Sequence, residues 1–184
     1  MPDFQIDPTL YNGRPDDVSG RIPSECAVYD FLDTLDVAYQ RLDHEAAPSI
    51  EACEGVEERL GAEICKNLFL CNRQKTDFYL LLMPGRKAFR TKDVTGQLGC
   101  SRLSFADGEQ MQALLHTTPG SASVLGLLFD PDQRVRLVID RDVMQHEFFA
   151  CHPCANTSSL RFTVKDMLET VLPALGHEIT YVTL

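Results

Sequence analysis

A chain of 184 residues, of which 44% are hydrophobic and 24% charged, suits one globular domain with a full core. It has no run of eighteen or more apolar residues, and its first residues lack a basic and apolar leader, so we expect neither a membrane span nor a secretion signal. The seven cysteines are odd in number and scattered, which argues against a disulfide framework and predicts a reducing, cytoplasmic location.

The net charge of −10 argues against a nucleic-acid partner, but the charges are unevenly distributed. Residues 64–102 hold eight bases and two acids, whereas the segments before and after them are acidic. The eight bases are Lys66, Arg73, Lys75, Arg86, Lys87, Arg90, Lys92 and Arg102. An anionic ligand would meet favourable charge along this segment, and a solvated surface is the alternative explanation.

In chain order, residues 1–22 contain prolines, glycines and aspartates that predict an extended N-terminal arm before a single domain over residues 23–184. Apolar residues at three- and four-residue steps then predict a helix from Pro23 to about Gln40. A short strand is expected over 41–47.

A second helix is predicted to open at Pro48-Ser49 and to end near Leu60, before Gly61. Residues 62–70 and 78–83 read as an antiparallel hairpin with a polar turn between them. The remainder is predicted to hold helices over 91–98, 107–115 and 164–175, a helical turn over 140–145, and strands over 103–105, 124–129, 134–139, 147–151, 158–162 and 179–182. Interspersed helices and strands without strict alternation indicate an α+β domain with a mixed sheet.

Lys66 and Asn67 interrupt the otherwise apolar strand sequence from Ile64 to Leu70. An ammonium group at such a position needs solvent or an anion. Lys66 therefore either extends to water or points into a cleft, where it would hold a phosphate or a developing negative charge.

The loop from His116 to Ser123 consists largely of small residues. Small side chains leave backbone N–H groups exposed, so the loop can bind an oxyanion or a phosphate oxygen, or it can be only a connector. A serine hydrolase using Ser121 or Ser123 with His152 as base is conceivable, but no nucleophile-elbow sequence supports it. Nor does a glycine-rich nucleotide motif appear.

Cys151-His152-Pro153-Cys154 has the spacing of a redox or metal-binding pair. A redox pair normally opens a helix, whereas this one follows a predicted strand. A zinc site would need a second ligand pair, and the spacing of Cys65 and Cys71 fits no common pattern. We therefore expect no metal here.

Three motifs together resemble the YbaK/prolyl-tRNA synthetase-associated editing domain family in order and spacing. They are Lys66-Asn67-Leu68-Phe69-Leu70, Pro119-Gly120-Ser121-Ala122-Ser123, and His152-Pro153 with Asn156-Thr157. The resemblance covers roughly residues 44–184, and within the family it is strongest to the free-standing deacylases that remove alanine wrongly attached to proline tRNA.

The resemblance implies an α+β fold with a central mixed, barrel-like sheet and surrounding helices, and hydrolysis of the ester that joins an amino acid to the tRNA 3′ end. It implies no cofactor and no metal. The expected partners are the acceptor end of mischarged tRNA(Pro) and, as a second partner, prolyl-tRNA synthetase; neither a membrane nor DNA is expected.

The resemblance also assigns roles to residues. Lys66 is the essential lysine beside the terminal adenosine, and Asn67 is its neighbour in the pocket. The catalytic loop, whose backbone amides face the scissile carbonyl, consists of Gly120, Ser121, Ala122 and Ser123. His152 helps to shape the amino-acid pocket. His44 is a further candidate for substrate binding, with a structural role as the alternative, because a lone histidine is more often structural than a ligand.

One departure concerns Val124, because many family members have proline at the end of this loop. The identity of the amino acid removed is therefore less firmly indicated than the reaction, and cysteine or serine are alternatives to alanine. A non-catalytic module that binds aminoacyl-tRNA or a synthetase is the alternative function.

Overall fold

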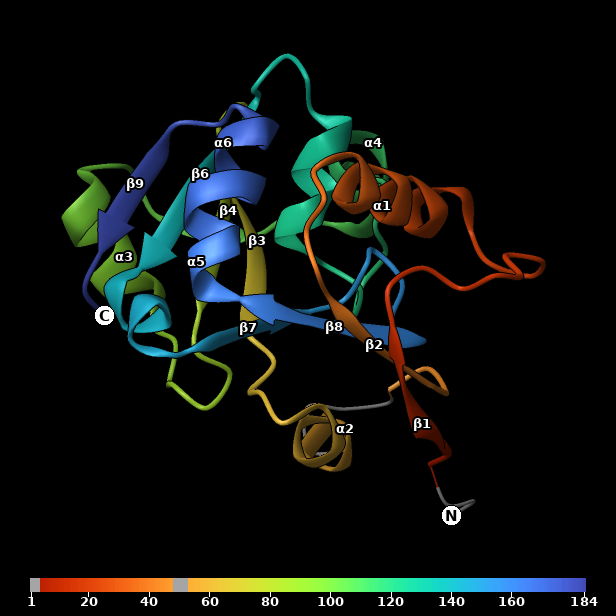
Figure 1. Cartoon of the computed structure of the whole chain (residues 1–184). Coiled ribbons are helices and arrows are strands. Elements are labelled where there is room, and N and C mark those ends of the chain that lie inside the picture. The colour runs from red at the N-terminus through yellow and green to blue at the C-terminus, as the bar shows by residue number, and fades with distance from the viewer. Residues whose placement is uncertain (1–3, 48–52) are drawn as a thin grey trace.

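Two β-sheets organise the computed structural model, which describes residues 4–47 and 53–184 (Figure 1). One sheet has four strands in the order β1-β2-β8-β7, and the other has five in the order β5-β3-β4-β6-β9. The strands are β1 (Ile6–Asn12), β2 (Gln40–His44), β3 (Lys66–Asn72), β4 (Phe78–Met83), β5 (Leu103–Phe105), β6 (Val135–Asp140), β7 (Phe148–Cys151), β8 (Ser158–Thr163) and β9 (Ile179–Val182).

The helices lie around these sheets (Figure 1). They are α1 (Pro23–Thr34), α2 (Cys53–Leu60), α3 (Thr91–Leu98), α4 (Gly108–Leu115), the 3-10 helices η1 (Val124–Phe129) and η2 (Arg141–Gln145), and a final helix composed of α5 (Val164–Asp166), a π-helical turn η3 (Met167–Val171) and α6 (Leu172–Leu175). None of the helices in the described residues has the length and apolar character of a membrane-spanning segment.

The five-stranded sheet is mixed. β3 pairs antiparallel with β4 and β5, whereas β4–β6 and β6–β9 are parallel pairs. The four-stranded sheet is antiparallel throughout. This arrangement confirms the predicted α+β domain with a mixed sheet; the described strands form two sheets rather than one closed barrel.

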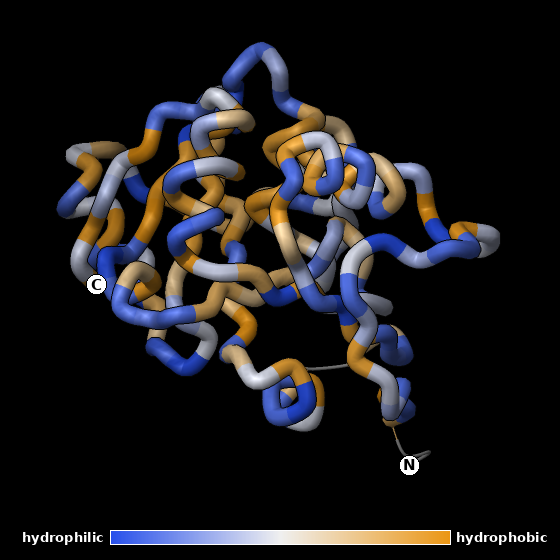
Figure 2. The backbone as a smooth tube through the Cα atoms, viewed as in Figure 1, coloured by the Kyte–Doolittle hydropathy of each residue, from blue (hydrophilic) through white to orange (hydrophobic). Residues whose placement is uncertain are grey.

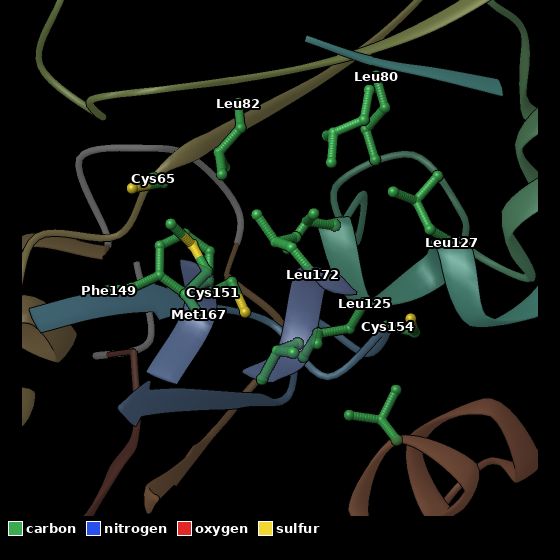
Figure 3. Packing of buried hydrophobic residues seen from close by; sticks show 14 of the residues in the cluster. Cys65, Leu80, Leu82, Leu125, Leu127, Phe149, Cys151, Cys154, Met167 and Leu172 are labelled. Carbon is green, nitrogen blue, oxygen red and sulfur yellow. The ribbon is translucent and has the colours of Figure 1, made fainter. Parts of the chain in front are cut away.

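The core fills the space on both sides of β4, whose six residues are all buried. One cluster lies between the sheets and includes Leu82, Phe149 and Leu172 (Figure 3), and a second lies on the opposite face of β4, beneath α3. The hydropathy colouring shows the same distribution, with hydrophobic stretches on the inner strands and hydrophilic ones on the outer loops (Figure 2). Burial of this apolar surface is the main force that stabilises the two layers.

Most of the predicted elements are confirmed within one or two residues, including helices α3 and α4 and the final helix and strand, and the predicted hairpin of β3 and β4 is present. Asp107 forms a capping box at the start of α4, and Thr163 caps α5. The predicted strand over 62–70 begins later, at Lys66, and Ile64 makes only an isolated bridge to Ala150.

The predicted end of the first helix is wrong. α1 ends at Thr34, because Asp36 adopts a left-handed conformation with φ 54°. Its N–H donates to Asp33 O, and Val37 N–H donates to Leu32 O, which is the hydrogen-bond pattern that closes a Schellman motif. The apolar residues beyond this point belong to the approach to β2, although their spacing also fits a helix.

The predicted pairing of a strand over 124–129 with a return strand over 134–139 is also wrong. Residues 124–129 form η1, because Ser123 Oγ accepts from Leu125 N–H at its start. Gly126 allows close packing on α4, since a Cβ there would lie 2.9 Å from Leu115 O. β6 (Val135–Asp140) therefore pairs with β4 and β9 instead.

Two predictions concern the region before β3. Part of the segment expected as an arm forms β1, which pairs with β2, while the division of the chain at residue 22 stays a prediction. The predicted start of the second helix at Pro48-Ser49 lies outside the described residues, and the described part of that helix ends at Leu60, as expected.

Candidate active site

A cleft of about 680 Å³ lies between α2, the start of β3, the loop after β4, the loop before η1 and the end of β7. Its described lining residues are Ala47, Cys53, Glu54, Glu57, Ile64, Cys65, Lys66, Asn67, Leu68, Gly85, Arg86, Gly120, Ala122 and His152. Lys66, Asn67, two loop residues and His152 are thus brought together, although they are distant in sequence.

Lys66 stands at the first residue of β3 and is partly buried. Its Nζ donates to Lys87 O at 2.8 Å. The side chain of Lys87 is held in turn by two carboxylates, at 2.7 Å from Asp140 Oδ2 and 2.6 Å from Asp142 Oδ2. The ammonium of Lys66 is therefore positioned at the cleft wall and carries no ion pair among the described residues.

Asn67 joins β3 to the loop before η1. Its Oδ1 accepts from Val124 N–H at 2.7 Å, and its Nδ2 donates to Cys65 O at 3.0 Å. A proline at position 124 has no N–H and could not make the first bond. The valine found here therefore gives the loop a hydrogen-bonded anchor to the same strand that carries Lys66.

The loop presents alternate residues to the cleft. Gly120, at φ 90°, and Ala122 line it, and their N–H groups have no hydrogen-bond partner among the described residues. Ser121 and Ser123 are buried behind them, at 2% and 0% exposed. Ser121 Oγ donates to Thr118 O and Ser123 Oγ accepts from Leu125 N–H, so both hydroxyl groups stabilise the loop rather than face the cleft.

His152 lines the cleft and is held from behind. Its Nδ1 lies 2.8 Å from Ser158 O and 3.2 Å from Ser159 Oγ. Because a carbonyl oxygen only accepts, Nδ1 carries the proton. Burial lowers the pKa of His152 to about 4, so the ring is neutral at pH 7. Its Nε2, for which the described residues provide no hydrogen-bond partner, is then an acceptor for a ligand.

His44 lies one layer behind His152, with their ring centroids 5.9 Å apart. Its Nδ1 donates to Glu45 O, and its Nε2 accepts from Ser159 Oγ at 2.9 Å. Burial also lowers the pKa of His44. His44 is absent from the described cleft lining, so its contact with the cleft runs through Ser159 and His152.

The basic segment is partly neutralised. Four of its eight bases form ion pairs: Lys75 with Asp107, Arg86 with Glu57, Lys87 with Asp140 and Asp142, and Arg90 with Asp93. Two of the bases, Lys66 and Arg86, line the cleft, and Lys66 is the one of the two without an ion pair among the described residues.

The motif from Cys151 to Cys154 is part of the core. Both thiols are buried among apolar side chains (Figure 3), and burial raises the pKa of each. Both are free cysteines. No group of three or more His, Cys, Asp or Glu side chains in the described part of the chain is arranged to hold a metal ion.

The sequence reasoning missed the support around these residues. Gly85 allows the loop after β4 to approach the start of β3, since a Cβ there would lie 2.3 Å from Ile64 O. This close approach places Lys87 O within reach of Lys66. In the sequence, Pro84-Gly85 signals only a strand break, and nothing marks Ser159 as the link between two histidines.

The fold and cleft define a class of protein: an α+β domain with a cleft at the start of one strand. This cleft is lined by a lysine, by a neutral histidine, and by two loop residues whose N–H groups have no partner in the part of the chain that the structure describes. A family model described as an aminoacyl-tRNA editing domain matches residues 44–170. The chain therefore belongs to the aminoacyl-tRNA editing domain family, as its resemblance to the prolyl-tRNA editing proteins predicted.

Two relatives are similar to the chain in sequence, and one solved structure is similar to it in fold. The chain is 29% identical over 151 residues to the prolyl-tRNA editing protein ProX of Acetoanaerobium sticklandii, covering 82% of this chain and 92% of that protein. It is 28% identical to mouse (Mus musculus) prolyl-tRNA synthetase associated domain-containing protein 1, covering 80% and 88%. A crystal structure described as a candidate trans-editing enzyme for prolyl-tRNA synthetase superposes with a TM-score of 0.64 at 18% identity, covering 89% and 98%.

Proposed function

We propose that this protein is a hydrolase that acts in trans on mischarged tRNA(Pro), cleaving the ester between alanine and the 3′ end of the tRNA. The observation that carries the proposal is the cleft lined by Lys66, Gly120 and Ala122, in which the N–H groups of the last two have no partner among residues 4–47 and 53–184. A relative named as a prolyl-tRNA editing protein supports the choice of tRNA.

The chemistry follows from these groups. Hydrolysis of an ester places negative charge on the carbonyl oxygen, and preorganised N–H donors in a water-poor cleft stabilise that charge. The amides of Gly120 and Ala122 are such donors, and the Lys66 ammonium adds a positive charge for the developing oxyanion or the adjacent phosphate. Water is the proposed nucleophile, activated by the ribose hydroxyl of the tRNA.

The histidines define the amino-acid side of the cleft. A neutral His152 can accept a hydrogen bond through Nε2 from the substrate's amino group, and His44 fixes the ring through Ser159. Small apolar groups of Ala47, Cys65 and Ala122 in the lining suit an alanine side chain. No metal or cofactor enters this scheme.

The test is hydrolysis of tRNA(Pro) charged with alanine, serine, cysteine or proline, by the intact protein and by Lys66→Ala. Lys165→Ala is the matched control, because Lys165 is an exposed lysine on α5 outside the cleft. We expect rapid loss of alanine, slowed about 100-fold or more by Lys66→Ala and unaffected by Lys165→Ala.

Other outcomes would contradict parts of the proposal. Faster removal of cysteine or serine would refute alanine as the substrate and retain the reaction. Tight tRNA binding with no hydrolysis of any ester by the intact protein would refute the hydrolase and favour a binding module.

A further inference from the structure

An exposed aromatic side chain lies on the same face of the mixed sheet as Lys66. Side chains alternate along a strand, so Lys66, Leu68 and Leu70 share one face of β3. In the pairing of β3 with β5, Leu70 is opposite Phe105, and directly opposed residues point to the same face. Phe105 is 61% exposed, at the edge of the sheet.

Phe89 links Phe105 to the cleft. The two rings form an edge-to-face pair with centroids 5.9 Å apart. Phe89 follows two residues after Lys87, whose carbonyl oxygen accepts the hydrogen bond from Lys66 Nζ. Leu68 belongs to the same apolar cluster as Phe89 and also lines the cleft. The aromatic pair is therefore continuous with the cleft wall.

The segment that carries Phe89 is basic. Between Pro84 and Asp93 it holds Arg86, Lys87, Arg90 and Lys92 and no acid. The side chains of Arg86 and Arg90 are 76% and 79% exposed. The pair of Arg90 with Asp93 is largely exposed and weak, so a phosphate group can replace that carboxylate at little cost. Arg86 is held by Glu57, whose side chain is 13% exposed, and its guanidinium still reaches solvent, where it can meet a second anion.

We propose that Phe105 and Phe89 form a stacking platform for the unpaired bases that precede the terminal adenosine of the tRNA acceptor end, with Arg86 and Arg90 meeting their phosphates. The inference rests on the proposed function and identifies how the same cleft holds its substrate. Aromatic side chains next to a basic segment are the usual means of binding single-stranded nucleic acid without reading its sequence. Leu70, opposite Phe105, is about 14 Å along β3 from Lys66, a span that a few nucleotides cover.

The first test compares two substrates of the intact protein: alanyl-tRNA(Pro), and an alanyl ester of adenosine that lacks the preceding nucleotides. For Phe105→Ala, the ratio of kcat/KM on the tRNA to that on the adenosine ester is expected to fall about 5- to 150-fold, through KM. Phe105→Trp keeps an aromatic face and is expected to retain the ratio.

Tyr181→Ala is the matched control. Tyr181 is an exposed aromatic residue on β9, at the opposite edge of the same sheet, and the ratio is expected to match that of the unaltered protein. An unchanged ratio in Phe105→Ala, or an equal fall with both substrates, would overturn the stacking platform.

A binding measurement separates this inference from the hydrolase proposal. Fluorescence anisotropy of labelled, uncharged tRNA(Pro) reports the platform without any turnover. If the protein binds tRNA through Phe105 but cleaves no ester, the hydrolase proposal fails and the platform stands. If the protein cleaves alanyl-tRNA and Phe105→Ala binds tRNA as tightly as the unaltered protein, the platform fails and the hydrolase proposal stands. If the protein neither binds nor cleaves the tRNA, both proposals fail.

Discussion

Replacing His152 with glutamine, which cannot titrate, is expected to remove one source of instability in acid. In the folded protein the pKa of His152 is about 4, because burial disfavours the charged ring, against 6.5 for the exposed group. Between these values the unfolded chain binds more protons than the folded one. The stabilising effect of the neutral ring is therefore complete above pH 6.5 and is lost as the pH falls to 4.

The size of the loss in stability follows from the pKa shift of His152. A displacement from 6.5 to about 4 corresponds to about 3 kcal/mol in total, of which about 2 kcal/mol is lost by pH 5. Urea denaturation from pH 7.5 to pH 5 gives the free energy of unfolding of the unaltered protein and of His152→Gln. The difference between them is expected to change by about 2 kcal/mol over this range.

His146→Gln is the control for this experiment, because it makes the same substitution at an exposed histidine. Parallel profiles of the unaltered protein and His152→Gln would refute the neutral, buried state of His152. A relative gain in stability of the unaltered protein in acid would mean that the protonated ring finds an anion, and the role of Nε2 as an acceptor would fall with it.

Two further predictions concern the supports of the cleft. Asn67→Ala leaves the buried N–H of Val124 without its acceptor. It is expected to lower the free energy of unfolding by about 1–3 kcal/mol, measured by urea denaturation, and to slow alanyl-tRNA hydrolysis. Unchanged stability would contradict the anchoring role of Asn67. Lys87→Met leaves the carboxylate of Asp140, which is 0% exposed, without its cation and is expected to cost about 3–5 kcal/mol, measured in the same way. Adding Asp140→Asn should recover much of this loss, and a double variant no more stable than Lys87→Met would contradict the ion pair as its cause.

The sequence was sufficient to predict those elements whose ends are set by residues next to them in the chain. The capping box of Asp107 and the apolar strands around a polar turn predict α4 and the hairpin of β3 and β4 correctly. Elements fixed by tertiary contacts were not predictable in this way. The run from Val124 to Phe129 is apolar throughout, and such a short run does not distinguish a strand from a buried helix by its periodicity.

The same distinction holds for the cleft. The motif residues Lys66, Asn67 and His152 were recognisable, and the structure places all three at its wall. Their supports were not, because a backbone carbonyl such as Lys87 O and a common residue such as Ser159 gain a role only through the approach of distant segments. Nor could the sequence show that the hydroxyl groups of Ser121 and Ser123 are buried and bond within the loop.

The adjacency of Lys66 and Asn67 has a geometric reason. Successive residues of a strand point to opposite faces, so Lys66 reaches outward to Lys87 O while Asn67 reaches inward to Val124 N–H. The start of one strand thus fixes both the cation and the loop whose residues Gly120 and Ala122 line the cleft. A slip of the strand by one residue would exchange the two faces, release the loop and direct the ammonium into the core. The apolar strand is therefore interrupted by two polar residues because one binds a backbone group on the outer side of the sheet and the other binds a backbone group on the inner side.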